Sequence, residues 1–150
     1  MTVMDASDLE LRNLSYGLFV ELGRAPSADE TAERAGVPRE KVLSGWARLH
    51  EQHAIVLEPG GESIRMANPF SSVPTVHRVL AAGRWWYANC AWDAFGICAA
   101  LRVDGRIETS CADCGDALEI EVRAGRPSDE SLVFHCLVPA AGWWDDIVFT

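Results

Sequence analysis

The stretch that decides the fold is residues 84–96, Arg84-Trp85-Trp86-Tyr87-Ala88-Asn89-Cys90-Ala91-Trp92-Asp93-Ala94-Phe95-Gly96. Its aromatic first half is typical of a β-strand, and its second half is typical of the start of a buried helix. This change of pattern places Cys90 at the helix N-terminus and Asp93 three positions later. Residues three apart share one face of a helix, so we expect the two side chains to lie together.

Cys90 and Asp93 have complementary chemistry at these positions. A thiol at a helix N-terminus feels the positive end of the helix dipole and exposed backbone N–H groups, and both favour the thiolate. A carboxyl group among apolar neighbours tends to keep its proton. The pair would therefore combine a soft nucleophile or metal ligand with a proton donor. A buried structural cysteine beside a capping aspartate has the same spacing, so spacing alone leaves both interpretations open.

The composition limits the class of partner. The chain has 150 residues, 49% of them hydrophobic, which is enough for a folded domain with a sizeable core. Its 22 acidic residues outnumber 13 basic ones and give a formal net charge of −9. Because affinity for nucleic acids and anionic membranes depends on clustered Lys and Arg, we expect neither partner.

The cysteine count and the N-terminal sequence indicate a reducing compartment. Residues 1–5 are acidic and lack the basic and apolar regions of a secretory signal, and no window is long enough for a membrane span. We therefore expect a cytoplasmic protein. Its five cysteines, an odd number, favour reduced thiols used for chemistry or metal binding over a disulfide framework.

The N-terminal part, residues 1–67, has the outline of a winged-helix domain. The patterns predict helices at 5–22, from the capping box at Ser27 to Gly36, and at 38–53, followed by a hairpin of residues 55–57 and 64–66. The third of these helices has a surplus of only one positive charge. We therefore favour an architectural role over DNA binding.

Residues 68–74 are rich in turn formers and predict a linker, after which residues 75–150 predict an α+β domain. The expected domain is a mostly antiparallel mixed β-sheet with one buried helix. The expected helix is residues 91–101. The expected strands are residues 75–80, 85–87, 107–109, 117–122 and 132–138, of which the last is expected to be more central. The chain ends on an apolar run, which is unusual for a natural terminus, so a truncated C-terminus is one interpretation.

Cys111 and Cys114 form a second candidate site at CxxC spacing. A closed zinc site needs four ligands, and His135 and Cys136 are the nearby candidates for completing it. Adjacent residues of a strand point to opposite faces, so only one of these two would reach the same metal. Packed or surface thiols on a turn are the alternative interpretation.

Several of these motifs together resemble the alkylmercury lyase (organomercurial lyase) family. The resemblance rests on residues 86–94, the Cys111–Gly115 turn, the Asn68-Pro69-Phe70-Ser71 joint and the winged-helix-like N-terminal part. It extends from about Leu9 to Thr150, and Cys90-Ala91-Trp92-Asp93 is its most specific segment. It implies a helical domain followed by a mixed sheet domain, and an enzyme that cleaves carbon–mercury bonds by protonolysis.

The resemblance also implies roles for single residues. Cys90 corresponds to the first catalytic cysteine, whose thiolate attacks mercury, and Asp93 to the aspartate that passes a proton to the leaving carbon; both would bind the metal. Cys111 corresponds to a structural cysteine. The implied substrate is a small organomercurial and the implied bound product is mercury(II). No cofactor is implied beyond external thiols that remove the ion, and a thiol protein that accepts mercury is a further implied partner.

The family uses a second catalytic cysteine, which we expect just past Thr150. Either the chain stops before this ligand, or it is a relative that has lost it. Cys136 is the one candidate for a replacement. The alternative functions are a non-catalytic protein that binds mercury or another thiophilic metal, and a metal-sensing winged-helix regulator that uses Cys111 and Cys114.

Overall fold

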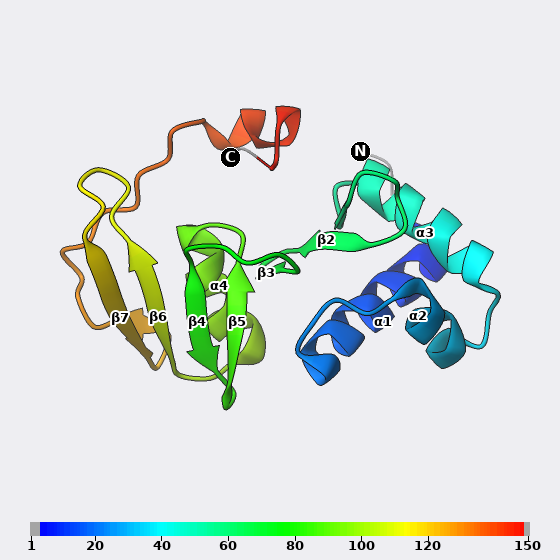
Figure 1. Cartoon of the computed structure of the whole chain (residues 1–150), viewed down its shortest axis with the longest axis horizontal. Helices are drawn as coiled ribbons and strands as arrows, with labels where there is room; N and C mark the ends of the chain where they lie inside the picture. The colour runs from blue at the N-terminus through cyan, green and yellow to red at the C-terminus, as the bar shows by residue number, and fades with distance from the viewer. Residues whose placement is uncertain (1–3, 149–150) are drawn as a thin grey trace. The chain divides into compact units, whose positions relative to one another are not determined.

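The computed structural model describes residues 4–148 and divides the chain into two compact units. The first unit ends at Val73, and the second begins at Pro74. The first unit contains three helices and a short hairpin, and the second contains a sheet and the helix α4; these elements are labelled in Figure 1. The α+β class predicted from the sequence is therefore confirmed.

The helices of the first unit are α1 (Ala6–Leu22), α2 (Ala28–Ala35) and α3 (Arg39–Glu51). Local capping explains the first two. The Asp5 carboxylate accepts the Asp8 N–H at 2.9 Å at the start of α1, and both hydrogen bonds of the Ser27–Glu30 capping box are present in α2. The third helix ends two residues earlier than expected, because His53 adopts a left-handed backbone conformation with φ of 62°.

Three short antiparallel strands complete the first unit: β1 (Val56–Leu57), β2 (Ile64–Ala67) and β3 (Phe70–Ser71). The rings of Phe19 and Phe70 stack with their centroids 5.4 Å apart, and Trp46 is fully buried. The segment expected as a linker therefore contributes β3 and a core aromatic residue to this unit.

The positive charges of α3 are largely engaged within the first unit. Arg48 binds the carboxylate of Asp8, which is only 2% exposed, at 2.6 Å, and Arg39 contacts Glu62 at 3.0 Å and Asp29 at 3.4 Å. Arg39 and Arg48 of α3 are therefore both paired with carboxylates of the same unit.

The second unit is an antiparallel sheet with α4 (Ala91–Leu101) packed on one face (Figure 1). Within this unit the strand order is β5-β4-β6-β7-β8. The strands are β4 (Arg78–Ala81), β5 (Arg84–Ala88), β6 (Gly105–Ser110), β7 (Ala117–Arg123) and β8 (Arg126–Pro127). Alternate residues such as Val79, Trp86 and Ile107 are buried, as is Ile97 of α4, so this face forms the core of the unit. A 3₁₀ helix, Ala140–Asp145, follows.

The predicted central strand at residues 132–138 is wrong. This segment has no regular secondary structure, and Val133 and Leu137 are 89% and 81% exposed. Its apolar composition favours a strand, but a strand needs a partner for its backbone groups and none of the described strands pairs with it. Instead the segment contacts α4 through the rings of Phe134 and Trp92, whose centroids are 5.7 Å apart.

Gly105 is the position where the second unit tolerates least added volume. A Cβ atom there would lie 2.6 Å from Cys98 Sγ and 3.0 Å from the Leu80 carbonyl oxygen. We expect Gly105→Ala to lower the free energy of unfolding by about 1–3 kcal/mol, as overpacking usually does. Gly17→Ala is the matched control, because Gly17 is at an exposed position of α1 and nothing lies within 4 Å of an added Cβ there. This control should raise the free energy of unfolding by about 0.5–1 kcal/mol. Urea unfolding of both variants tests this, and equal effects would contradict it.

Candidate active site

Cys90 lies where β5 passes directly into α4. Both backbone groups of Ala88, at the end of β5, are hydrogen-bonded. The Ala88 N–H donates to the His77 carbonyl at 2.9 Å, and the Ala88 carbonyl accepts from the Thr75 hydroxyl at 2.7 Å. Cys90 is then the N-cap residue of α4 in an extended conformation (φ −147°, ψ 179°). The strand thus fixes the position of the thiol, and the start of the helix gives it amide neighbours.

Two opposing effects act on the Cys90 thiol. The side chain makes no regular capping hydrogen bond, but the N–H groups of Trp92 and Asp93 face the sulfur and lower its pKa. Burial acts in the opposite direction and is the larger effect, so the net result is a pKa above the ordinary cysteine value. The helix N-terminus alone favours the Cys90 thiolate, as predicted from the sequence, but the cost of burying the negative charge of that thiolate is larger. The free site therefore holds Cys90 mainly as a thiol near neutral pH.

Asp93 is partly buried in the first turn of α4. Burial raises the pKa of its carboxyl group, while a 3.0 Å hydrogen bond from Asn89 Nδ2 to Asp93 Oδ2 acts to lower it. The Asp93 charge also raises the pKa of Cys90, so the two side chains are close enough to interact. The sequence analysis assigned no role to Asn89. Its i, i+4 spacing from Asp93 is the signal that would have found it.

Cys136 lies on the irregular segment 132–138, near enough for its charge to act on Cys90. It is exposed, its thiol donates to the Val138 carbonyl at 3.4 Å, and its negative charge when ionised raises the pKa of Cys90. The segment is held over the start of α4 by the contact between Phe134 and Trp92. The charges of Asp93 and Cys136 therefore both act on Cys90 at the N-terminus of α4, although within residues 4–148 these three groups are not arranged to hold a metal ion together.

Cys111 and Cys114 lie elsewhere, in the turn between β6 and β7. Within residues 4–148, no group of three His, Cys, Asp or Glu side chains is arranged to hold a metal ion. Neither His135 nor Cys136 therefore joins the turn as a third ligand, because the strand expected to carry them does not form. The donor set present does not fit the four-ligand zinc site that the spacing allowed.

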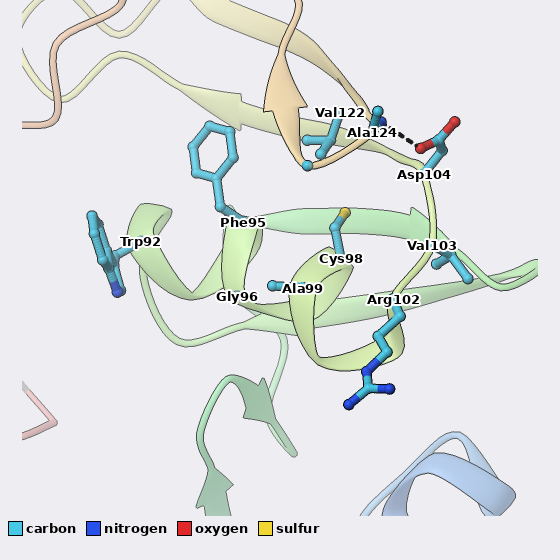
Figure 2. Close-up of a pocket in the computed structure, with 11 residues that line it drawn as sticks. Trp92, Phe95, Gly96, Cys98, Ala99, Arg102, Val103, Asp104, Val122 and Ala124 are labelled. Atoms are coloured by element: carbon cyan, nitrogen blue, oxygen red, sulfur yellow. Dashed lines mark hydrogen bonds between the residues drawn. The ribbon is translucent and has the colours of Figure 1, made fainter.

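A cavity of about 610 Å³ lies along another face of α4 (Figure 2). Figure 2 shows Phe95 and Cys98 pointing from the helix toward Val122, with the Cys98 sulfur facing the cavity. Cys98 is only 3% exposed, and burial raises the pKa of its thiol. Cys90, Asp93 and Cys136 do not line this cavity, so it is distinct from the cluster at the helix N-terminus.

The opposite pKa shifts of two cysteines predict an order of alkylation. Backbone N–H groups in the β6–β7 turn lower the pKa of Cys111, whereas burial raises that of Cys90. As pH rises, the Cys111 thiolate forms first, so iodoacetamide near pH 7.5 should modify Cys111 several times faster than Cys90. Peptide mapping by mass spectrometry after brief exposure measures both rates. A faster reaction at Cys90 would show that the helix N-terminus outweighs burial.

Comparisons with known proteins agree on one family. Residues 70–150 match the family model described as "MerB: Alkylmercury lyase". Ten chains among the solved structures match, including "Crystal structure of the mercury-bound form of MerB2", with 26% sequence identity and a TM-score of 0.67. That alignment covers 85% of this chain, which spans 61% of the length of the MerB2 chain. A search of the curated proteins found no match.

Proposed function

Since the chain belongs to the alkylmercury lyase family, we propose that it cleaves the carbon–mercury bond of small organomercurials by thiolate attack and protonolysis. The observation that carries the proposal is the placement of Cys90 and Asp93 together at the start of α4, with Cys136 close enough for its charge to act on Cys90. The charges of Asp93 and Cys136 both act on the Cys90 thiol. Two soft ligands and a proton donor are the groups that this reaction requires.

The first step exchanges the ligand on mercury. The Cys90 sulfur bonds to the mercury of R–Hg–X, X leaves as an anion, and the thiol proton passes to a base. Because burial disfavours the free thiolate, this proton has to move as the sulfur–mercury bond forms, and the nearby Asp93 carboxylate is the base that we assign to it. Bond formation to a soft cation then stabilises the thiolate that the free protein disfavours.

The second step breaks the carbon–mercury bond. Cys136, to which we assign the second thiolate, releases its proton to solvent as its sulfur binds mercury, and this coordination weakens the bond between mercury and carbon. The bonding electron pair stays with carbon, which takes the proton from Asp93 and leaves as the hydrocarbon R–H. Mercury remains in the +2 state and is bound by the two sulfurs once Cys136 has moved to the metal, so the reaction needs no oxidant, reductant or cofactor. External thiols, or a thiol protein that accepts mercury, would then remove the ion.

A single-turnover assay tests this function. The chain is mixed with less than one equivalent of phenylmercury acetate and an excess of a monothiol, and benzene is measured by gas chromatography. Cys114→Ser is the matched control, because it removes an exposed thiol outside the cluster. Benzene release by both the parent chain and this control supports the lyase function. Retention of phenylmercury without benzene release would instead support the non-catalytic mercury-binding alternative.

A further inference from the structure

The turn between β6 and β7 brings two thiols together away from the proposed active site. β6 and β7 pair as far as Ser110 and Ala117, so only residues 111–116 form the connection. The connection is closed by hydrogen bonds from the Gly115 N–H to the Cys111 carbonyl at 2.9 Å and from the Cys111 N–H to the Asp116 carbonyl at 2.8 Å. Gly115 has a φ of 79°, a conformation that glycine adopts without strain. The sheet therefore holds the loop in one compact shape.

Backbone amides in this loop are arranged around the Cys111 sulfur. The N–H groups of Asp113 and Cys114, and the Cys114 thiol itself, lie close enough to lower the pKa of Cys111. Cys114 is exposed and Cys111 is partly exposed, so both sulfurs can be reached from solvent.

The ligand count selects the kind of ion. Residues 4–148 supply these two sulfurs with no third side chain of the ligating types, so a tetrahedral zinc site would be left incomplete. Mercury(II) is a soft cation that is satisfied by two thiolates in a nearly linear arrangement, and the exposed Cys114 side chain can rotate to provide it. The neighbouring acidic side chains of Asp113 and Asp116 add attraction for a cation.

We propose that Cys111 and Cys114 form a second mercury(II) site, which holds the ion through two sulfurs without help from Cys90. Binding replaces two S–H bonds by two S–Hg bonds and releases two protons, with no change in oxidation state. This site goes beyond the lyase function and does not rest on it, since inorganic mercury(II) would bind even if no carbon–mercury bond were cleaved. In a lyase it would hold released ion on the same chain.

The test uses the full chain with Cys90 and Cys136 both replaced by serine, so that the first cluster is removed. Reduced protein is loaded anaerobically with mercuric chloride, and a large excess of 2-mercaptoethanol then competes for the metal. We expect one mercury per chain to remain after gel filtration, measured by elemental analysis. Adding Cys114→Ser should weaken retention by roughly 10²–10⁴-fold, because one thiol loses the advantage of two linked ligands.

Two controls keep the result specific. Cys98→Ala, added to the chain that already lacks Cys90 and Cys136, removes the last thiol outside the proposed site and should leave mercury retention unchanged. Thermal unfolding should show that the Cys114→Ser chain is folded, as expected for an exposed side chain. Failure of the doubly substituted chain to retain mercury would overturn the proposal, and so would retention that Cys114→Ser does not reduce. Formation of a Cys111–Cys114 disulfide in place of the mercury complex, detected by mass, would also overturn it.

Discussion

Replacing Cys90 by serine is expected to abolish benzene release from phenylmercury, with the single-turnover rate falling by more than about 10³-fold. The structure places this thiol at the N-cap of α4, with the charges of Asp93 and Cys136 acting on it. A serine hydroxyl fits the same space, but its oxygen is a hard donor that stays protonated and does not displace a ligand from soft mercury. A loss of activity in this variant would therefore come from the chemistry of the donor atom and not from its size.

The companion variant Cys136→Ser separates two versions of the mechanism. If Cys136 is the second thiolate, its loss should lower the rate by a similar factor, because groups that act as a unit are lost as a unit. Phenylmercury should still bind through Cys90, and mass spectrometry of the adduct can show this. Normal turnover by Cys136→Ser would assign the second thiolate to another residue and leave the role of Cys90 intact. Normal turnover by Cys90→Ser would refute the proposed mechanism itself.

The features that sequence reasoning predicted well are those set by neighbours in the chain. The capping box at Ser27, the end of α1 at Gly23 and the helix at 91–101 each depend on residues within one or two turns. The proximity of Cys90 and Asp93 belongs to the same class, because spacing on a helix determines it.

The features that sequence reasoning missed depend on contacts between distant segments. Residues 132–138 have the composition of a strand, but pairing requires a neighbouring edge, and their position follows instead from the contact of Phe134 with Trp92. The same segment carries Cys136 close enough for its charge to act on Cys90, although in the sequence Cys136 is closer to the CxxC turn. The net pKa shift of Cys90 was missed for a related reason, since burial depends on the whole fold.

Asp93→Asn is expected to separate mercury binding from bond cleavage. The amide has the size of the carboxyl group and can keep a hydrogen bond with Asn89 after rotation, so the first turn of α4 should remain intact. It neither accepts the Cys90 proton nor delivers one to carbon. Removal of a positioned acid–base group typically costs 10²–10⁴-fold, and we expect a fall of about that size in benzene release, while the phenylmercury adduct on Cys90 still forms more slowly as the thiol proton is lost to solvent.

The pH dependence of the parent chain gives this prediction a second readout. Burial raises the pKa of Asp93, and the Asn89 hydrogen bond is the effect that opposes it. Removing that bond with Asn89→Ala should raise the pKa further, so the carboxylate that accepts the Cys90 proton is already protonated at higher pH and the acid-side fall in the single-turnover rate moves upward. In Asp93→Asn this limb should disappear from the profile. A profile that neither variant moves would assign the transferred proton to a group other than Asp93, because no other proposed donor accepts a hydrogen bond from Asn89.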